Sequence, residues 1–340
     1  MKRKTKILVI WVTASILLQF LFLWFVDSFY LKNRGTIVEV VPYEDDSNSR
    51  EFANILIPKD ASELKISFDG SHVAYVLDGK LVISDIYGDA AIEVISKNEK
   101  ILYYRWLQDR NMVIYSYNAF SKGEYFTYVE TYDIETELTR SYPPIENVKN
   151  GYGVESIELS PLTNMVYVNI KTDSGPQKVY RYDIIEELKY IGEFGENKKI
   201  FSTYNTDSLV FQNDKNSFCM MMDSSKKIVK FDFDIAVLDV DSRDRIFVGQ
   251  LENEKVIKVL FGKTTDFDKK SFTEMKLSKP VLPEDITLAH SGDIFVNDVN
   301  LSRILNLKDN LYVKYKGKAV GVTDEGVFAV ENNMLKFFRF

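Results

Sequence analysis

The sequence predicts an all-β fold, a β-propeller of seven blades, preceded by one apolar N-terminal helix. Three observations support this prediction: a strand-turn-strand repeat with a period of about 42 residues, a composition with 20 Tyr and 23 Phe, and 20 consecutive uncharged residues near the N-terminus. Four strands with their turns need about 40 to 45 residues, the size of one propeller blade. A six-bladed ring is the alternative if the short fourth copy merges with a neighbour.

The first expected element is the N-terminal helix, since residues 7–26 carry no charge. At about 1.5 Å per residue such a helix is roughly 30 Å long, which matches the hydrocarbon core of a bilayer. We therefore expect 7–26 to be a transmembrane signal anchor whose partner is the lipid bilayer. Residues 1–6 would form a basic cytoplasmic tail, and 27–52 a juxtamembrane linker.

Charge sets the expected orientation of this anchor. Four cations precede the apolar segment, whereas residues 27–50 carry three cations and five anions. The positive-inside rule then places the N-terminus in the cytoplasm and the domain at 53–340 outside the cell membrane. A cleaved signal peptide is the competing interpretation, although the apolar regions of such peptides span only about 7 to 15 residues.

The repeat occupies most of the remaining chain. Its seven polar turns lie at 66–71, 105–110, 160–164, 204–208, 240–244, 289–293 and 322–326. In the first copy, Asp78-Gly79 is a favoured pair for a two-residue hairpin between two apolar strands. The last copy shows only three strands, and a propeller is stable when its first and last blades are joined. We therefore expect one of the segments 36–41 and 53–58 to complete the seventh blade, with a strand at 54–57 as the preferred choice.

These repeats resemble known propeller families. Ser67-Phe68-Asp69-Gly70 with Asp85-Ile86 is similar to blades of the Tol-type and WD-like bacterial propellers. Residues 241–248 and 291–298 resemble the repeats of NHL-type and gluconolactonase-like propellers. The resemblance covers most of 64–340 and implies the architecture of a membrane-anchored bacterial propeller, without choosing one family. The Arg243-Asp244 pair departs from the pattern, which usually has a Gly there.

Composition and motifs limit the functions that the sequence supports. The net charge of −7 argues against a nucleic-acid partner, because phosphate contacts need clustered Lys and Arg. The two histidines, His72 and His290, both lie in repeat turns, and neither a Gly-x-Ser-x-Gly nor a His-Glu-x-x-His motif is present. No catalytic residue, metal site or cofactor is therefore predicted. The only cysteine, Cys219, is expected to be buried in a strand.

Carboxylates are the remaining candidates for chemistry. Asp232, Asp234 and the segment 239–244 bring several Asp together, and calcium binds where several oxygens converge in a tight loop. Alternating Asp on a strand more often marks a solvated face. We therefore interpret these residues as a solvated surface and keep a metal site as the alternative.

Ligands are expected at the loops that join second to third strands and each blade to the next. The loops so predicted are 118–124, 143–153, 172–177, 194–199, 213–216 and 278–285. Long loops of a rigid scaffold often carry function. The predicted ligand-binding residues are Asn118, Lys122, Asn147, Lys149, Tyr152 and Asp173.

The sequence thus favours a non-enzymatic protein that docks a protein or glycan at the cell envelope. The alternative is a metal-dependent propeller hydrolase or lactonase that uses carboxylates in the central channel.

Overall fold

The computed structural model describes residues 2–25, 55–88, 91–93, 99–121, 123–146, 153–172, 175–195, 199–222, 225–263, 271–289 and 291–340. The chain divides into two compact units, Met1–Arg50 and Glu51–Phe340.

In the first unit the helix α1 runs from Lys2 to Phe25. It therefore begins earlier than the predicted boundary at 7 and includes the basic residues that were expected to form a separate tail. In the part of the chain that the structure describes, no helix has both the length and the apolar character for crossing a membrane.

In the second unit, the described strands form seven antiparallel sheets, which we call blades one to seven. Blade one contains β1 (Ser62–Ile66), β2 (His72–Leu77), β3 (Lys80–Asp85) and β4 (Ala91–Glu93). Blade two contains β5 (Ile101–Trp106), β6 (Met112–Ser121), β7 (Glu124–Asp133) and β8 (Leu138–Ser141). Blade three contains β9 (Gly153–Ser160), β10 (Met165–Lys171), β11 (Gln177–Tyr182) and β12 (Leu188–Phe194). Blade four contains β13 (Ile200–Ser202), β14 (Leu209–Asp214), β15 (Ser217–Met222) and β16 (Ser225–Lys230).

The last three blades follow the same plan. Blade five contains β17 (Ile235–Val240), β18 (Arg245–Glu252), β19 (Lys255–Lys263) and β20 (Thr273–Val281). Blade six contains β21 (Ile286–Leu288), β22 (Ile294–Asp298), β23 (Arg303–Asn306) and β24 (Leu311–Lys314), with the short 3₁₀ helices η4 (Pro283–Asp285) and η5 (Val299–Leu301) at its loops. Blade seven contains β25 (Lys318–Thr323), β26 (Gly326–Glu331) and β27 (Met334–Arg339).

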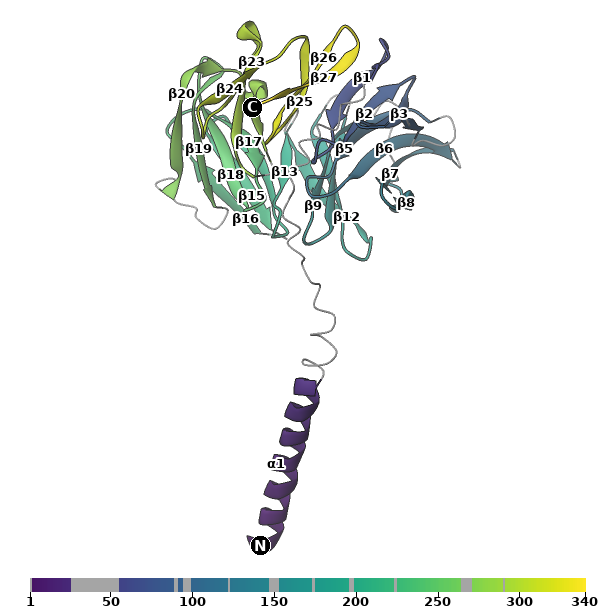
Figure 1. Cartoon of the computed structure of the whole chain (residues 1–340), viewed down its shortest axis with the longest axis vertical. Helices are drawn as coiled ribbons and strands as arrows, with labels where there is room; N and C mark the ends of the chain where they lie inside the picture. The colour runs from purple at the N-terminus through teal and green to yellow at the C-terminus, as the bar shows by residue number, and fades with distance from the viewer. Residues whose placement is uncertain are drawn as a thin grey trace. The chain divides into compact units, whose positions relative to one another are not determined.

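These blades confirm the predicted seven-bladed β-propeller. The short fourth copy of the repeat forms its own sheet, so the six-bladed alternative is wrong. The first strands of neighbouring blades contact one another: β1 contacts β5 and β25, β9 contacts β5 and β13, and β17 contacts β13 and β21. The first strands therefore line the central channel, and blade one lies beside blade seven (Figure 1).

Local sequence explains the hairpins. Asp78 and Gly79, predicted as a two-residue turn, join β2 to β3 and have φ angles of 51° and 80°. Positive φ at both positions is the signature of a type I′ turn, whose twist matches that of the flanking strands. Glycine adopts such angles without steric cost, which is why this pair favours the hairpin.

The core lies between the blades. The structure describes seven clusters of buried apolar side chains, each built from two neighbouring blades, because one four-stranded sheet cannot bury both of its faces alone. Cys219 lies in one such cluster on β15 and is 2% exposed, which confirms the prediction of a buried strand.

The ring closes next to β27. The backbone N–H of Ile57 donates to the Asn333 carbonyl at 2.7 Å, and the N–H of Leu335 donates to the Ile55 carbonyl at 3.0 Å. The described residues 55–57 therefore lie beside β27 as a fourth element of blade seven. Ile57 also packs in the cluster that joins blades seven and one.

Candidate functional site

A cavity of about 210 Å³ lies at the end of the central channel where the first strands of the blades end. Its lining comes from β1, β5, β17, β21 and β25 and from the turns that follow them. The lining residues are Ile66, Ser67, Phe68, Trp106, Leu107, Gln108, Asp239, Val240, Asp241, Ser242, Leu288, Ala289, Val322, Thr323 and Asp324. The charged residues among them are all carboxylates.

This cavity lies at the opposite end of the channel from the predicted binding loops. The first strand of each blade begins at the loop from the preceding blade and ends at its own first turn. The cavity is lined from that second end, whereas the predicted loops belong to the first end.

Three charged side chains from different blades lie near one another in the channel. Arg105 on β5 forms an ion pair with Glu158 on β9, and its Nη1 also donates to the Ile157 carbonyl at 3.3 Å. The Arg105 and Glu158 side chains are 21% and 11% exposed. Asp239 on β17 interacts electrostatically with Arg105 and also lines the cavity.

Burial controls how these groups ionise. Removal from water raises the pKa of Asp239 to about 6, although the Val240 N–H and the Arg105 charge act to lower it. Burial likewise raises the pKa of Glu158 above its ordinary value, and Arg105 opposes that shift. For Arg105, burial acts to lower the pKa, but the interactions with Glu158, Tyr103 and Asp239 together outweigh it and the pKa rises. Arg105, Glu158 and Asp239 therefore lie in a poorly solvated setting, and burial also lowers the pKa of the nearby Lys65 to about 8.

The carboxylates that follow β17 have structural partners. Asp241 accepts hydrogen bonds from the backbone N–H of Arg243 at 3.0 Å and of Arg245 at 2.8 Å, and it pairs with the Arg245 guanidinium at 2.6 Å. Asp241 and Asp244 are 4% and 7% exposed. The interpretation of this segment as a solvated face is therefore wrong, because its carboxylates are turned inward to hold the turn.

Polar contacts between the first turns of neighbouring blades surround the cavity end. Asn111 Nδ2 donates to Asp69 at 2.8 Å, which links blades two and one. The Tyr204 N–H donates to Asp244 at 2.6 Å, which links blades four and five. The Ser291 hydroxyl donates to Asp324 at 3.1 Å, which links blades six and seven. The turns therefore hold the blades in a fixed arrangement around the cavity.

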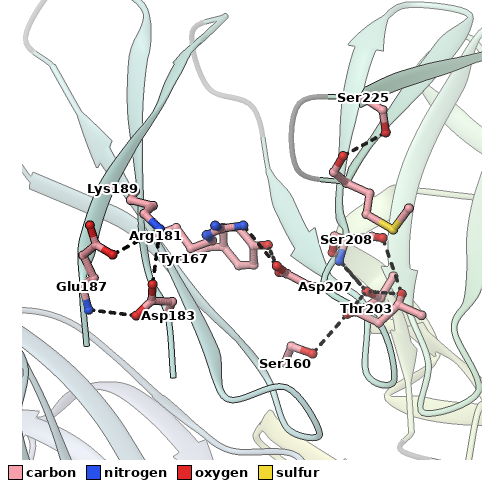
Figure 2. A network of polar contacts seen from close by, with 12 residues as sticks. Ser160, Tyr167, Arg181, Asp183, Glu187, Lys189, Thr203, Asp207, Ser208 and Ser225 are labelled. Carbon is pink, nitrogen blue, oxygen red and sulfur yellow. Dashed lines mark hydrogen bonds and ion pairs between the residues drawn. The ribbon is translucent and has the colours of Figure 1, made fainter. Parts of the chain in front are cut away.

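Figure 2 shows a similar network farther from the channel, between blades three and four. Arg181 on β11 forms an ion pair with Asp207 at 3.0 Å, and the Tyr167 hydroxyl donates to the same carboxylate. The Ser160 hydroxyl donates to the Tyr204 carbonyl at 3.3 Å across the same interface. These contacts fasten two blades together and account for the polar residues buried there.

Of the predicted ligand-binding residues, the structure describes Asn118. It lies within β6, opposite Thr127 on β7, and its Oδ1 accepts a hydrogen bond from the Thr127 hydroxyl at 2.7 Å. Strands β6 and β7 thus extend into the loop predicted at 118–124. The other five predicted residues lie outside the described residues: Lys122, Asn147, Lys149, Tyr152 and Asp173. Their role stays a prediction.

Of the two histidines, the structure describes His72. His72 begins β2 and its Nδ1 lies 2.7 Å from the Ser71 hydroxyl, which also donates to Asp69. The carboxylate therefore orients the hydroxyl and not the imidazole, the reverse of the order in a catalytic triad. His290 lies outside the described residues.

The channel residues were missed because charge was sought in loops. Four charged residues occupy one equivalent position, because each lies in a first strand and pairs with the third residue of the second strand of its blade: Lys65, Arg105, Glu158 and Asp239. A charged residue that recurs at one place inside apolar strands is the signal that would have found them. Within the described ranges, no group of three or more His, Cys, Asp or Glu is placed to hold a metal ion.

No protein-family model and no curated protein matches the sequence. Among solved structures, an oligogalacturonate lyase in complex with manganese is similar, with 10% identity, a TM-score of 0.57 and coverage of 85% of this chain and 95% of that chain. The AfRom2 CNH domain shares 10% identity with a TM-score of 0.50 over 84% of this chain and 96% of its own. Hsv2p of Kluyveromyces lactis shares 10% identity with a TM-score of 0.50 over 80% and 90%. These similarities support the propeller fold.

Proposed function

We propose that the chain is a non-enzymatic binding protein whose propeller docks a protein or glycan partner. The observation that carries this proposal is the cavity at the end of the channel, whose walls come from five blades. Contacts between turns link blades one and two, four and five, and six and seven around it. A pocket built on rigid elements is suited to recognition. Most polar groups around it hold turns or neighbouring blades and are not poised for chemistry.

The first test is capture of a partner by the full-length chain after crosslinking in its native membranes. Three variants are compared with wild type: replacement of residues 147–152 by a Gly/Ser linker, which leaves the buried Ile145 in place, Asp239→Asn in the cavity, and Asp309→Asn as a charge-matched control. Asp309 is exposed and does not line the cavity. We expect one defined partner that is retained by Asp309→Asn and lost with one of the other two. Equal capture by all variants, or capture of nothing, would contradict the proposal.

We also propose that α1 holds the protein at a membrane, with the propeller on the extracytoplasmic side. Support comes from the uncharged sequence at 7–26 and from the large apolar side chains exposed on α1, among them Trp11, Leu18 and Phe22 at 74%, 71% and 65%. Exposed apolar surface of this extent is costly in water. Wild type should stay in the membrane pellet after alkaline extraction, whereas a variant with Leu17→Lys and Leu21→Lys should be released. Release of wild type would refute this part of the proposal.

The enzymatic alternative has one observation in its favour, the two carboxylates with raised pKa in the channel. Such groups often mark catalytic sites, although structural ion pairs also produce them. If the channel were an active site, a lactone or glycoside panel should reveal turnover that Asp239→Asn and Glu158→Gln abolish. Turnover that survives both changes would remove the channel from consideration.

A further inference from the structure

The cavity differs from the rest of the propeller surface in the chemistry of its walls. Its described lining contains three carboxylates, Asp239, Asp241 and Asp324, and no Lys, Arg or His. Two of them already have partners, because Asp241 pairs with Arg245 and Asp324 accepts the Ser291 hydroxyl. Asp239 is the lining carboxylate to which the described residues give neither an ion pair nor a hydrogen bond from a side chain, although the charges of Arg105 and Lys199 act on it.

Asp239 stands apart from the other two in its hydrogen bonding. Its Oδ1 accepts only the N–H of the next residue, Val240, at 2.8 Å, and the described residues give its Oδ2 no hydrogen bond. Asp239 is partly exposed and lines the cavity, so this oxygen is accessible from the cavity. The open oxygen on the cavity wall is therefore a group that a ligand can satisfy.

The remaining walls suit an apolar stem. Trp106 and Phe68 both line the cavity, and Phe68 is 43% exposed. Long cationic side chains pack their methylene groups on apolar surface, and cations are attracted to aromatic faces. The cavity of about 210 Å³ is smaller than the roughly 300 to 1,000 Å³ typical of pockets for drug-sized molecules, so its size suits a single side chain.

We propose that the cavity binds one organic cation, the ammonium of a Lys or the guanidinium of an Arg from a protein partner, with Asp239 as its counter-ion. This inference rests on the proposed binding function and specifies the chemistry of the partner. An organic cation fits better than a metal ion, because the described carboxylates do not form a group of three that could coordinate one. Such a side chain requires one charge-assisted hydrogen bond to its charged end and apolar contact along its stem.

Trp106 provides the measurement. The chain contains three tryptophans, Trp11, Trp24 and Trp106, so a full-length variant with Trp11→Phe and Trp24→Phe carries its single indole at the cavity. This reporter protein, in detergent, is titrated with N-acetyl-lysine methylamide and N-acetyl-arginine methylamide. The matched probes are N-acetyl-norleucine methylamide, which lacks the charge, and calcium chloride, which lacks the stem.

We expect a saturable change in Trp106 fluorescence with at least one of the two cationic probes and none with norleucine or calcium. Asp239→Asn should weaken the binding about tenfold or more, since a hydrogen bond to a charged group is lost. Asp309→Asn should bind like the reporter protein. An Asp239→Glu variant keeps the charge and controls for misfolding, as it should retain part of the affinity.

Equal responses to lysine and norleucine probes, or unchanged affinity in Asp239→Asn, would overturn the inference. A calcium response that Asp239→Asn removes would overturn it too, in favour of a metal site. If cationic probes fail while crosslinking still captures a partner that Asp239→Asn does not affect, the partner chemistry is wrong but the binding function stands. If neither the titration nor the crosslinking gives a signal, both the cation-binding inference and the proposed binding function are wrong.

Discussion

The charged side chains on the inner and outer strands of the blades differ in their exposure to solvent. On the inner strands, Arg105, Glu158 and Asp239 are largely removed from water and interact across blade boundaries. On the outer strands, β8 is exposed along its whole length and β16 carries exposed lysines, among them Lys226. A solvated charge contributes little to stability, whereas a desolvated one is costly unless it is paired. The identity of a charged residue therefore matters at the centre of this ring and has little effect on stability at its rim.

Removing one member of the buried ion pair between Arg105 and Glu158 is expected to have the largest effect on stability. Arg105→Met leaves Glu158 in the channel without its partner, so we expect a loss of about 3 to 5 kcal/mol in the free energy of unfolding. Lys226→Ala at the rim should change it by less than about 0.5 kcal/mol. Chemical denaturation of both variants checks the difference. The double variant Arg105→Met with Glu158→Leu should recover much of the loss, and no recovery would show that the pair is not the cause.

The ring closure gives a second contrast within one segment. Ile57 is 4% exposed in the cluster between blades seven and one, whereas its neighbour Leu56 is 69% exposed. Ile57→Ala should cost about 2 to 4 kcal/mol, because it removes buried methyl groups at the junction, and Leu56→Ala should be almost neutral. Thermal unfolding of the two variants measures this. Equal effects would mean that the segment does not close the ring.

Asp239 offers a test through pH. Its raised pKa means that the folded state disfavours the ionised form, so Asp239 destabilises the fold above about pH 6 and this cost fades as the pH falls toward 4. Asp239→Asn should therefore be more stable than wild type at pH 7, by about 1 to 3 kcal/mol, and the gap should shrink in acid.

The groups that interact electrostatically with Asp239 are Arg105, Lys199, Asp241 and Glu158. Denaturation at pH 7, 6 and 4.5 measures the gap, and a gap that widened in acid would contradict the assignment. Gained stability together with lost cation binding would identify Asp239 as a functional residue kept at the expense of stability.

The smallest expected effect lies between blades three and four, where the ion pair stays in place. Tyr167→Phe removes one hydrogen bond to Asp207 but leaves Arg181 paired with it, so we expect a loss of about 1 kcal/mol. Calorimetric unfolding checks this value. A loss as large as that of Arg105→Met would show that distance from the channel does not reduce the cost of disturbing buried charge.

Much of the architecture could be predicted because it depends on local patterns. The strand-turn-strand repeat, the Asp78-Gly79 hairpin and the need for a closing strand all follow from residues near one another in sequence. The prediction of the ligand-binding loops depended on strand ends, which the sequence defines less well. Asn118 was expected in a loop but lies in β6, because cross-strand pairing with β7 extends the hairpin beyond the apolar residues that marked it.

The sequence alone determined that the chain forms seven β-sheet units in a ring, because the period of the strand-turn-strand repeat and the residues of its turns depend only on residues that are close together in sequence. The tertiary structure decided where the unusual electrostatics lie. Arg105, Glu158 and Asp239 are separated by 53 and 81 positions along the chain, and only the ring brings them into one poorly solvated channel. The recurrence of charge in the first strands marks the position of Asp239, but its raised pKa and its place on the cavity wall depend on neighbours from other blades.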